Sequence, residues 1–310
     1  MIERLPRFVF ALALMALLSA CGTDSSSSGD GNSSSDGGSN SGPGLSLRLT
    51  DAAFDDAVRV DVTFVEVRLR KTSGGWISIP VNPAQKIELA SLQGTKTADL
   101  LLDVDVDPGD YNELRLIVDT ATMANSIELR AGGVVNLMIP SGGSSGLKIK
   151  GDFTIWDTRP TSIVVDVDLR QSIIAAGPNF IMRPVLRLVS GDNFGHVRGT
   201  IDDPNKLSGA NCSDAWAGTY NAVYVYEGHD VVPADINQLS TTDVDPVTTS
   251  RVAYDPLVGA YVYEAAFLPA GDYTIAFTCN SDLDELNTDE DMKFFDIQNV
   301  TVQVSNTTFL

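Results

Sequence analysis

The fold is decided by the stretch Val58-Arg59-Val60-Asp61-Val62-Thr63-Phe64-Val65-Glu66-Val67-Arg68-Leu69-Arg70. Apolar residues occupy its even positions as far as Phe64 and its odd positions from Val65 onward. This period of two is typical of a β-strand with one buried face. A strand cannot exchange its two faces without an extra residue, so the stretch also predicts a β-bulge near Phe64–Val65.

The same alternation recurs along the rest of the chain, for example over 114–118, 147–149 and 163–169. Turn-forming clusters such as Asp107-Pro108-Gly109-Asp110 and Ser141-Gly142-Gly143 separate these runs. Only residues 84–92 suggest a short turn of helix. Many short strands between Gly/Pro turns predict an all-β fold, which we interpret as two tandem β-sandwich domains over residues 45–190 and 195–310.

The N-terminal residues 1–20 have the pattern of an export signal. Arg4 and Arg7 precede an apolar run over 8–18 that is too short to span a bilayer comfortably. Leu18-Ser19-Ala20-Cys21 then resembles the bacterial lipobox, which implies cleavage before Cys21 and lipid on its sulfur.

Residues 21–44 are expected to be a lipidated cysteine followed by a disordered tether, because Gly22–Gly44 is almost wholly Ser, Gly, Asn and Asp. The residue after Cys21 is glycine and not the aspartate associated with inner-membrane retention. We therefore expect a protein of the bacterial cell envelope, lipid-anchored in the outer membrane.

The charge balance narrows the classes of partner. The formal net charge is −20, and removing residues 1–20, with two arginines and one glutamate, makes it −21. A chain this acidic repels nucleic acid and attracts divalent cations. With Cys21 lipidated, Cys212 and Cys279 remain, and an exported compartment favours a disulfide between them.

Several short motifs together resemble a known family. They are Leu49-Thr50-Asp51-Ala52-Ala53, Gly75-Trp76-Ile77, Pro108-Gly109-Asp110-Tyr111 with Arg115-Leu116, Pro140-Ser141-Gly142 with Gly146-Leu147-Lys148, Asp166-Val167-Asp168 with Ser172-Ile173, and Arg183-Pro184-Val185. The family is domain of unknown function 4382, found in exported bacterial lipoproteins, and the resemblance covers residues 45–190. It implies a location and a β fold but no activity.

Residues 195–310 resemble a second family. The order G-x-V-x-G-x-I from Gly195, Ala222-Val223-Tyr224-Val225-Tyr226 and F-x-x-x-G-x-Y-x-I from Phe267 is similar to transthyretin-like modules of carboxypeptidase regulatory domains. Insertions over 204–219 and 228–250 are longer than such modules usually carry.

Three groups of residues are candidates for chemistry or binding. Asp166 and Asp168 share one strand face about 6.5–7 Å apart, a spacing that suits a cation site or acid–base work unless Lys148, Lys150 or Arg170 neutralises them. The wider candidate polar site is Asp51, Lys148, Asp166, Asp168 and Ser172. The candidate ligand surface is Tyr224, Tyr226, Tyr261 and Tyr263, which would stack on sugar rings if exposed and otherwise pack across strands.

The third group is an acidic run whose oxygens suit Ca²⁺, although it fails the strict EF-hand pattern. Its candidate ligands are Asp282, Asp284, Asn287, Asp289 and Asp291. Only two histidines, His196 and His229, are present, and neither has neighbours typical of a metal site or a catalytic triad.

These features favour a noncatalytic cell-envelope lipoprotein that binds or displays at the surface, with carbohydrate, matrix polymer or another envelope protein as ligand. Two alternatives stay open: a carboxylate-based hydrolase of an extracellular polymer that uses Asp166 and Asp168, and a structural spacer stiffened by calcium.

Overall fold

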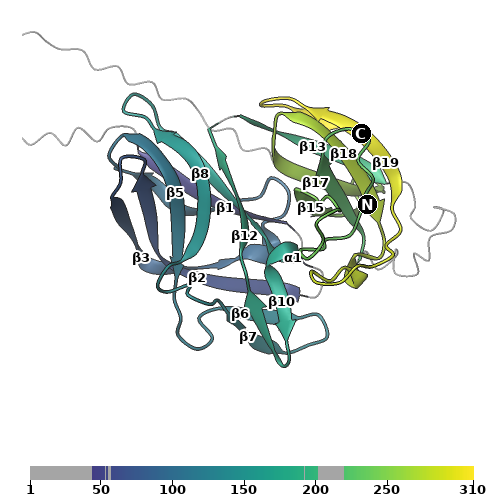
Figure 1. Cartoon of the computed structure of the whole chain (residues 1–310), viewed down its shortest axis with the longest axis horizontal. Helices are drawn as coiled ribbons and strands as arrows, with labels where there is room; N and C mark the ends of the chain where they lie inside the picture. The colour runs from purple at the N-terminus through teal and green to yellow at the C-terminus, as the bar shows by residue number, and fades with distance from the viewer. Residues whose placement is uncertain (1–43, 53, 55–56, 192, 202–219) are drawn as a thin grey trace, which may run out of the picture. The chain divides into compact units, whose positions relative to one another are not determined.

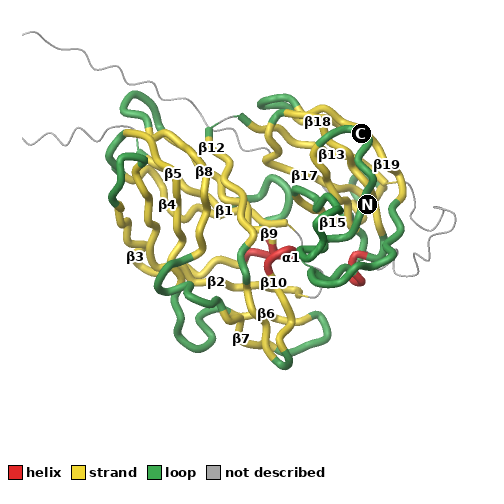
Figure 2. Tube along the Cα trace, in the orientation of Figure 1, coloured by secondary structure: helices red, strands yellow, loops and turns green. Residues whose placement is uncertain are grey.

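The computed structural model describes residues 44–52, 54, 57–191, 193–201 and 220–310, which lie in one compact unit that spans Ser41–Leu310 (Figure 1). The expected signal, Cys21, the tether and Cys212 lie outside these residues. The described part is almost entirely strands and loops (Figure 2), which confirms the all-β sandwich prediction. None of its helices is long and apolar enough to cross a membrane.

The first sandwich consists of two sheets. The smaller has the order β12 (Val185–Ser190), β9 (Thr161–Asp168), β1 (Leu45–Ala52), β4 (Ala98–Val104). The larger has the order β10 (Ile173–Ala176), β11 (Asn179–Met182), β7 (Val134–Met138), β6 (Ser126–Leu129), β2 (Ala57–Lys71), β5 (Gly109–Val118), β8 (Leu147–Ile155), and β3 (Trp76–Glu88) pairs with β2. Their inward faces enclose one core, which includes Leu47, Phe64, Leu116 and Val165.

The second sandwich has its own core around Val225, Tyr263 and Phe277. One sheet has the order β16 (Ala253–Asp255), β17 (Ala260–Pro269), β13 (Phe194–Ile201), β20 (Thr307–Phe309), and the other β15 (Thr248–Arg251), β14 (Ala222–Glu227), β18 (Gly271–Thr278), β19 (Phe295–Val302). The helical turns are η1 (Leu89–Ser91), α1 (Leu169–Ser172) and η4 (Ser281–Leu283).

The expected bulge lies where the sequence places it. Against β5, Phe64 lies opposite Val118 and Glu66 opposite Ile117, so Val65 is the extra residue. The register with β3 shifts at the same place, but there the extra residues lie on β3, because Phe64 pairs with Gln85 and Glu66 with Pro80. Val67 and Leu69 point into the core beyond it, and the charged residues between them point outward. The turn of helix expected over 84–92 is shorter than predicted, because β3 continues to Glu88 and only η1 is helical.

Candidate functional site

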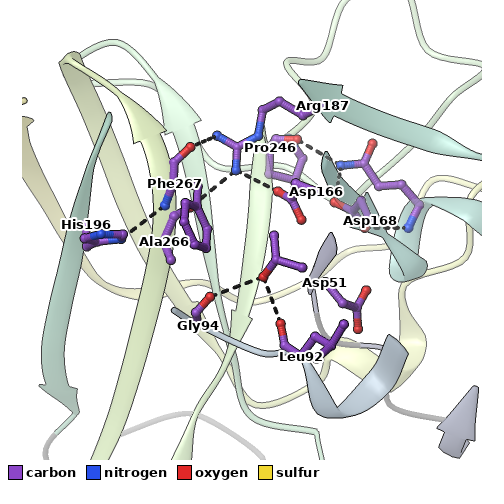
Figure 3. A network of polar contacts seen from close by, with 12 residues as sticks. Asp51, Leu92, Gly94, Asp166, Asp168, Arg187, His196, Pro246, Ala266 and Phe267 are labelled. Carbon is purple, nitrogen blue, oxygen red and sulfur yellow. Dashed lines mark hydrogen bonds and ion pairs between the residues drawn. The ribbon is translucent and has the colours of Figure 1, made fainter. Parts of the chain in front are cut away.

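The predicted polar site lies where the two sandwiches meet, around the end of β9 and the short helix α1 (Figure 3). Asp51, Asp166 and Asp168 are brought together there, and each is only 5 % exposed. Ser172, at the end of α1, is also buried. Four of the five predicted residues therefore share one region of the molecule.

Asp166 is neutralised by an arginine on the neighbouring strand. Arg187 on β12 lies opposite Asp166 on β9, and its Nη2 is 2.7 Å from the Asp166 Oδ2. The same guanidinium donates to the carbonyl oxygens of Phe267 at 2.7 Å and Ala266 at 3.3 Å, both on β17. One arginine thus neutralises a buried acid and connects the first sandwich to the second (Figure 3).

Asp168 is the N-cap of α1. Its Oδ1 accepts from the Gln171 backbone N–H at 2.9 Å and its Oδ2 from the Gln171 Nε2 at 2.9 Å. The Gln171 amide also donates to the Pro246 carbonyl in the second sandwich. Burial raises the pKa of Asp168 to about 6, so this carboxyl is only weakly acidic, and both of its oxygens are already engaged.

Asp51 is the acid least compensated by hydrogen bonds. Its Oδ1 accepts from the Leu169 backbone N–H at 3.2 Å, and its buried Oδ2 has no hydrogen-bond partner. Burial, followed by the charges of Asp166 and Asp168, raises its pKa well above the ordinary value. Such surroundings favour the neutral acid over the carboxylate.

Lys148 does not belong to this cluster, which corrects the predicted set. It lies on β8 in the larger sheet, where Leu147 and Ile149 point into the core and Lys148 therefore points to solvent. Ser172 has a structural role: its Oγ accepts a hydrogen bond from the Val185 backbone N–H at 2.8 Å, which connects α1 to β12.

A hydrolase needs two carboxyl groups that a polymer can reach. Asp51, Asp166 and Asp168 are buried between the sandwiches, and their carboxyl groups form hydrogen bonds or an ion pair within the protein. The buried Oδ2 of Asp51 has no hydrogen-bond partner. One interpretation of the sequence expected a basic residue on a neighbouring strand to neutralise Asp166. The structure shows such a residue, but it is Arg187 and not Lys148, Lys150 or Arg170. An arginine inside the apolar strand Val185–Ser190 was the signal in the sequence for a buried acidic partner.

Arg170 extends this junction into the second sandwich. The residue is buried, and its Nη1 donates to the Ser281 carbonyl at 2.9 Å and its Nε to the Thr249 Oγ1 at 3.3 Å. Its guanidinium carbon lies 5.7 Å from the centre of the Tyr224 ring. A charge from the first sandwich is thus held among side chains and carbonyls of the second.

The four tyrosines do not form a ligand surface. Tyr224, Tyr226, Tyr261 and Tyr263 are 0 %, 0 %, 6 % and 3 % exposed. Tyr261 and Tyr263 pack in the core of the second sandwich, whereas Tyr224 and Tyr226 pack in a separate cluster with Ile236 and Leu286. The hydroxyls of Tyr224 and Tyr226 donate to Asp284 and to the Ala234 carbonyl. The packing interpretation is therefore correct and the stacking interpretation is wrong, because Tyr261 and Tyr263 point into the core and the other face of β14, which carries Tyr224 and Tyr226, is covered as well.

The acidic run contributes two residues, the predicted ligand Asp284 and the unpredicted Glu290, to a compact group of carboxylates. Asp235, Asp284 and Glu290 can bring one oxygen each within 4.8 Å of one another. Burial raises the pKa of Asp235, and it raises that of Asp284 to about 6. The other predicted ligands Asp282, Asn287, Asp289 and Asp291 are exposed. Sequence reasoning missed Asp235 because it lies far from the run along the chain.

Cys279 is buried at the end of β18. Its predicted partner Cys212 lies outside the described residues, so the disulfide between them stays a prediction.

A solvent-open cleft lies at one end of the first sandwich. It has a volume of about 520 Å³ and is lined by the end of β8, the start of β9 and the residues after β12. Trp156 is 42 % exposed there, and the Arg159 guanidinium lies 4.7 Å from its ring centre. Asp110, Asp152 and Asn193 add polar groups to the wall. A half-exposed tryptophan among polar side chains provides a platform for a sugar ring.

Residues 44–184 match the model of the family described as Domain of unknown function (DUF4382). The comparison with curated proteins returned no match.

Several solved structures are distantly similar. The Bacillus anthracis TIE protein is 8 % identical over 86 % of this chain, with a TM-score of 0.19, and this chain spans about a third (33 %) of its length. GBS52, the minor pilin of Streptococcus agalactiae, is 11 % identical, with 86 % of this chain and 93 % of that chain covered and a TM-score of 0.19. A fimbrial protein from Bacteroides ovatus is 8 % identical, with 87 % and 48 % covered and a TM-score of 0.18. Scores of this size carry no inference about function.

Proposed function

We propose that this chain is a noncatalytic lipoprotein of the bacterial cell envelope that binds carbohydrate at the cell surface. The anchor is lipid on Cys21, placed in the outer membrane, and the tether over 22–44 holds the sandwiches away from it. The observation that carries the proposal is the contrast in access. The acids suited to hydrolysis are buried in the junction, whereas the Trp156 cleft opens to solvent.

The cleft suits binding without chemistry. The Trp156 ring offers apolar area for a pyranose face, and Asp110, Asp152 and Asn193 offer acceptors and donors for hydroxyl groups. The Asp110 Oδ1 already accepts from the Thr154 hydroxyl at 2.7 Å, which fixes one wall of the cleft.

The test uses the chain from residue 21 with Cys21→Ser, so that no lipid is attached. Binding to an array of neutral and acidic glycans is measured for this protein and for Trp156→Ala. We expect the substitution to weaken binding to the preferred neutral glycan about tenfold, because aromatic contacts of this kind contribute about 1–1.5 kcal/mol. Tyr254→Ala is the matched control, since Tyr254 is an aromatic residue 55 % exposed on the second sandwich, away from the cleft. Equal binding by the wild type and Trp156→Ala would remove the cleft as the site.

Calcium in the second sandwich is a further part of the proposal, and the carboxylate group Asp235, Asp284 and Glu290 supports it. Three oxygens, one from the loop after β14 and two from the loop after β18, could bind one Ca²⁺ together with water and so stiffen the ends of these strands. Its role would be structural, since it lies in the second sandwich and the Trp156 cleft in the first.

A further inference from the structure

The outer face of the larger sheet carries a concentration of positive charge. Arg68 on β2, Arg115 on β5 and Lys148 on β8 lie opposite one another in a single row across three strands. Arg70 on β2 and Lys150 on β8 flank the next row, with Glu113 between them. We call Arg68, Arg70, Arg115, Lys148 and Lys150 the cationic strip. Its three strands are neighbours in the larger sheet, in the order β2-β5-β8, and β5 and β8 are seen side by side in Figure 1.

The strip is unusual for this chain. The whole protein carries 21 basic and 41 acidic residues, yet the strip gathers five basic side chains against two acidic ones, Glu66 and Glu113. Like charges directly opposite one another on a sheet destabilise it. Neighbouring strands lie about 4.8 Å apart, so the row Arg68, Arg115, Lys148 places three positive charges within about 10 Å. Stability alone would favour acidic residues at some of these positions.

The three arginines of the strip are held in place by its two acids. Arg68 pairs with Glu66, with its Nη2 2.8 Å from Oε2, and its Nη1 donates to the Ser144 carbonyl at 3.0 Å. Arg115 and Arg70 share the other acid. Glu113 is buried beneath them, 2.7 Å from the Arg115 Nε and 3.7 Å from Arg70. The Trp76 ring lies against both, with its centre 4.2 Å from the Arg115 guanidinium and 5.9 Å from that of Arg70. Guanidinium groups fixed in this way lose little entropy when they bind an anion.

The lysines of the strip are unengaged. Lys148 and Lys150 are exposed, and neither forms an ion pair with any described residue. They complete a surface whose outer edge is free to meet a partner, in contrast to the basic residue of the junction, Arg187, which is used internally.

The shape of the strip favours a narrow polyanion. Acidic side chains bound it toward one end of β8 and β5, where Asp152 and Asp110 are exposed. A flat anionic membrane would meet these acids together with the lysines, whereas an extended chain would contact the strip alone. Charge interactions act over about 8 Å at physiological salt, so the acidic remainder of the protein does not cancel the strip.

We propose that the cationic strip binds an acidic polysaccharide, with carboxylate or sulfate groups on the row Arg68, Arg115, Lys148 and a sugar ring against Trp76. This inference rests on the proposed binding role but uses a surface separate from the Trp156 cleft. The ligand class is anionic, although the protein as a whole is strongly acidic.

The test is binding of polygalacturonate to the Cys21→Ser chain, measured by biolayer interferometry against neutral dextran. The Lys148→Gln/Lys150→Gln double variant should weaken binding about tenfold or more, because each lysine contact with an anionic surface contributes on the order of a factor of five. Affinity should also fall with added salt on a log–log plot. The control is Lys96→Gln/Lys293→Gln, which removes the same charge from exposed lysines elsewhere and should bind as the wild type does.

Loss of binding in both double variants would overturn the strip, because net charge alone would then explain it. Binding to vesicles of phosphatidylglycerol but not to polygalacturonate would also overturn it, in favour of a membrane. Failure of the Trp156 cleft leaves polygalacturonate binding intact, so the two proposals fail separately.

Discussion

The junction and the cationic strip are both clusters of charge, but they treat their charges in opposite ways. At the junction Asp166 and Asp168 are buried, and each is matched by one partner, Arg187 or Gln171. On the strip like charges stand opposite one another at the surface, and two lysines have no ion-pair partner in the described chain. Burial requires compensation, whereas exposed lysines without an ion-pair partner are available for a ligand. We therefore assign a structural role to the junction and a binding role to the cationic strip.

The largest effect is expected from a substitution that disrupts the junction, the contacts of Asp166, Asp168, Arg170 and Arg187 between the two sandwiches. Arg187→Met leaves Asp166 buried without its partner and removes two hydrogen bonds to the second sandwich. The free energy of unfolding should fall by about 3 kcal/mol, as for other buried pairs that lose one member. Urea unfolding measures it, with Arg198→Met on an exposed position of β13 as control. A change equal to that of the control would mean that the junction does not hold the sandwiches together.

The acids of the junction should also make stability depend on pH. Asp51 and Asp168 have pKa values raised by burial, that of Asp168 from 3.8 to about 6, so the folded state binds their protons more tightly than the unfolded state does. Protonation of these two carboxyl groups stabilises the folded state relative to the unfolded state. This stabilisation is fully present below the pKa of the unfolded state and is lost as pH rises through the pKa of the folded state. Stability should therefore fall from pH 4 toward pH 6 and above, by at most about 1.4 kcal/mol per pH unit for each group.

Asp51→Asn sharpens this point, because the amide replaces the neutral acid without a titrating proton. The variant should be at least as stable as the wild type at pH 8 and should show a shallower pH dependence. Thermal unfolding at several pH values tests it, with Asp105→Asn, an exposed loop acid, as control. An unchanged pH dependence would show that Asp51 does not titrate differently in the two states.

Calcium gives a smaller effect, confined to the second sandwich. With Ca²⁺ at ten times its dissociation constant, binding contributes about 1.4 kcal/mol and raises the Tm by about 2–4 °C. Asp284→Asn should abolish the rise, while Asp289→Asn, an exposed acid of the same run, should keep it. No rise in the wild type would leave the carboxylate group as a hydrogen-bonded structural cluster.

The smallest effect on stability is expected on the strip. Lys148→Gln/Lys150→Gln removes like-charge repulsion and should change the free energy of unfolding by about 0.5 kcal/mol or less, toward greater stability. Chemical unfolding beside the Lys96→Gln/Lys293→Gln control checks it. A loss of more than 1 kcal/mol would mean that these lysines stabilise the sheet, and the comparison with the junction would not hold.

Much of the fold could be predicted from local patterns. The period of two along 58–70 predicted β2, and the change of parity at Phe64–Val65 predicted its bulge. The approach of Asp51, Asp166 and Asp168 followed from motifs that fall on the paired strands β1 and β9. These patterns lie within single short segments of the sequence, so they can be recognised without knowledge of the tertiary structure.

The positions of side chains across sheets could not be predicted in the same way. Lys148 and Asp166 look like partners in the sequence, but they lie in different sheets, and alternation alone does not say which face of which sheet a residue shares. The tyrosines alternate as exposed residues would, yet both faces of β14 are covered. The row Arg68, Arg115, Lys148 depends on the registers of three strands that are far apart in sequence.

One paired measurement tests the assignment most directly: polygalacturonate affinity and free energy of unfolding, both for Arg187→Met and for Lys148→Gln/Lys150→Gln. We expect Arg187→Met to lose about 3 kcal/mol of stability and to keep its affinity at temperatures where it is folded. The lysine variant should lose affinity about tenfold and keep its stability. The reverse pattern, or loss of both properties in both variants, would contradict the separation of a structural junction from a binding face.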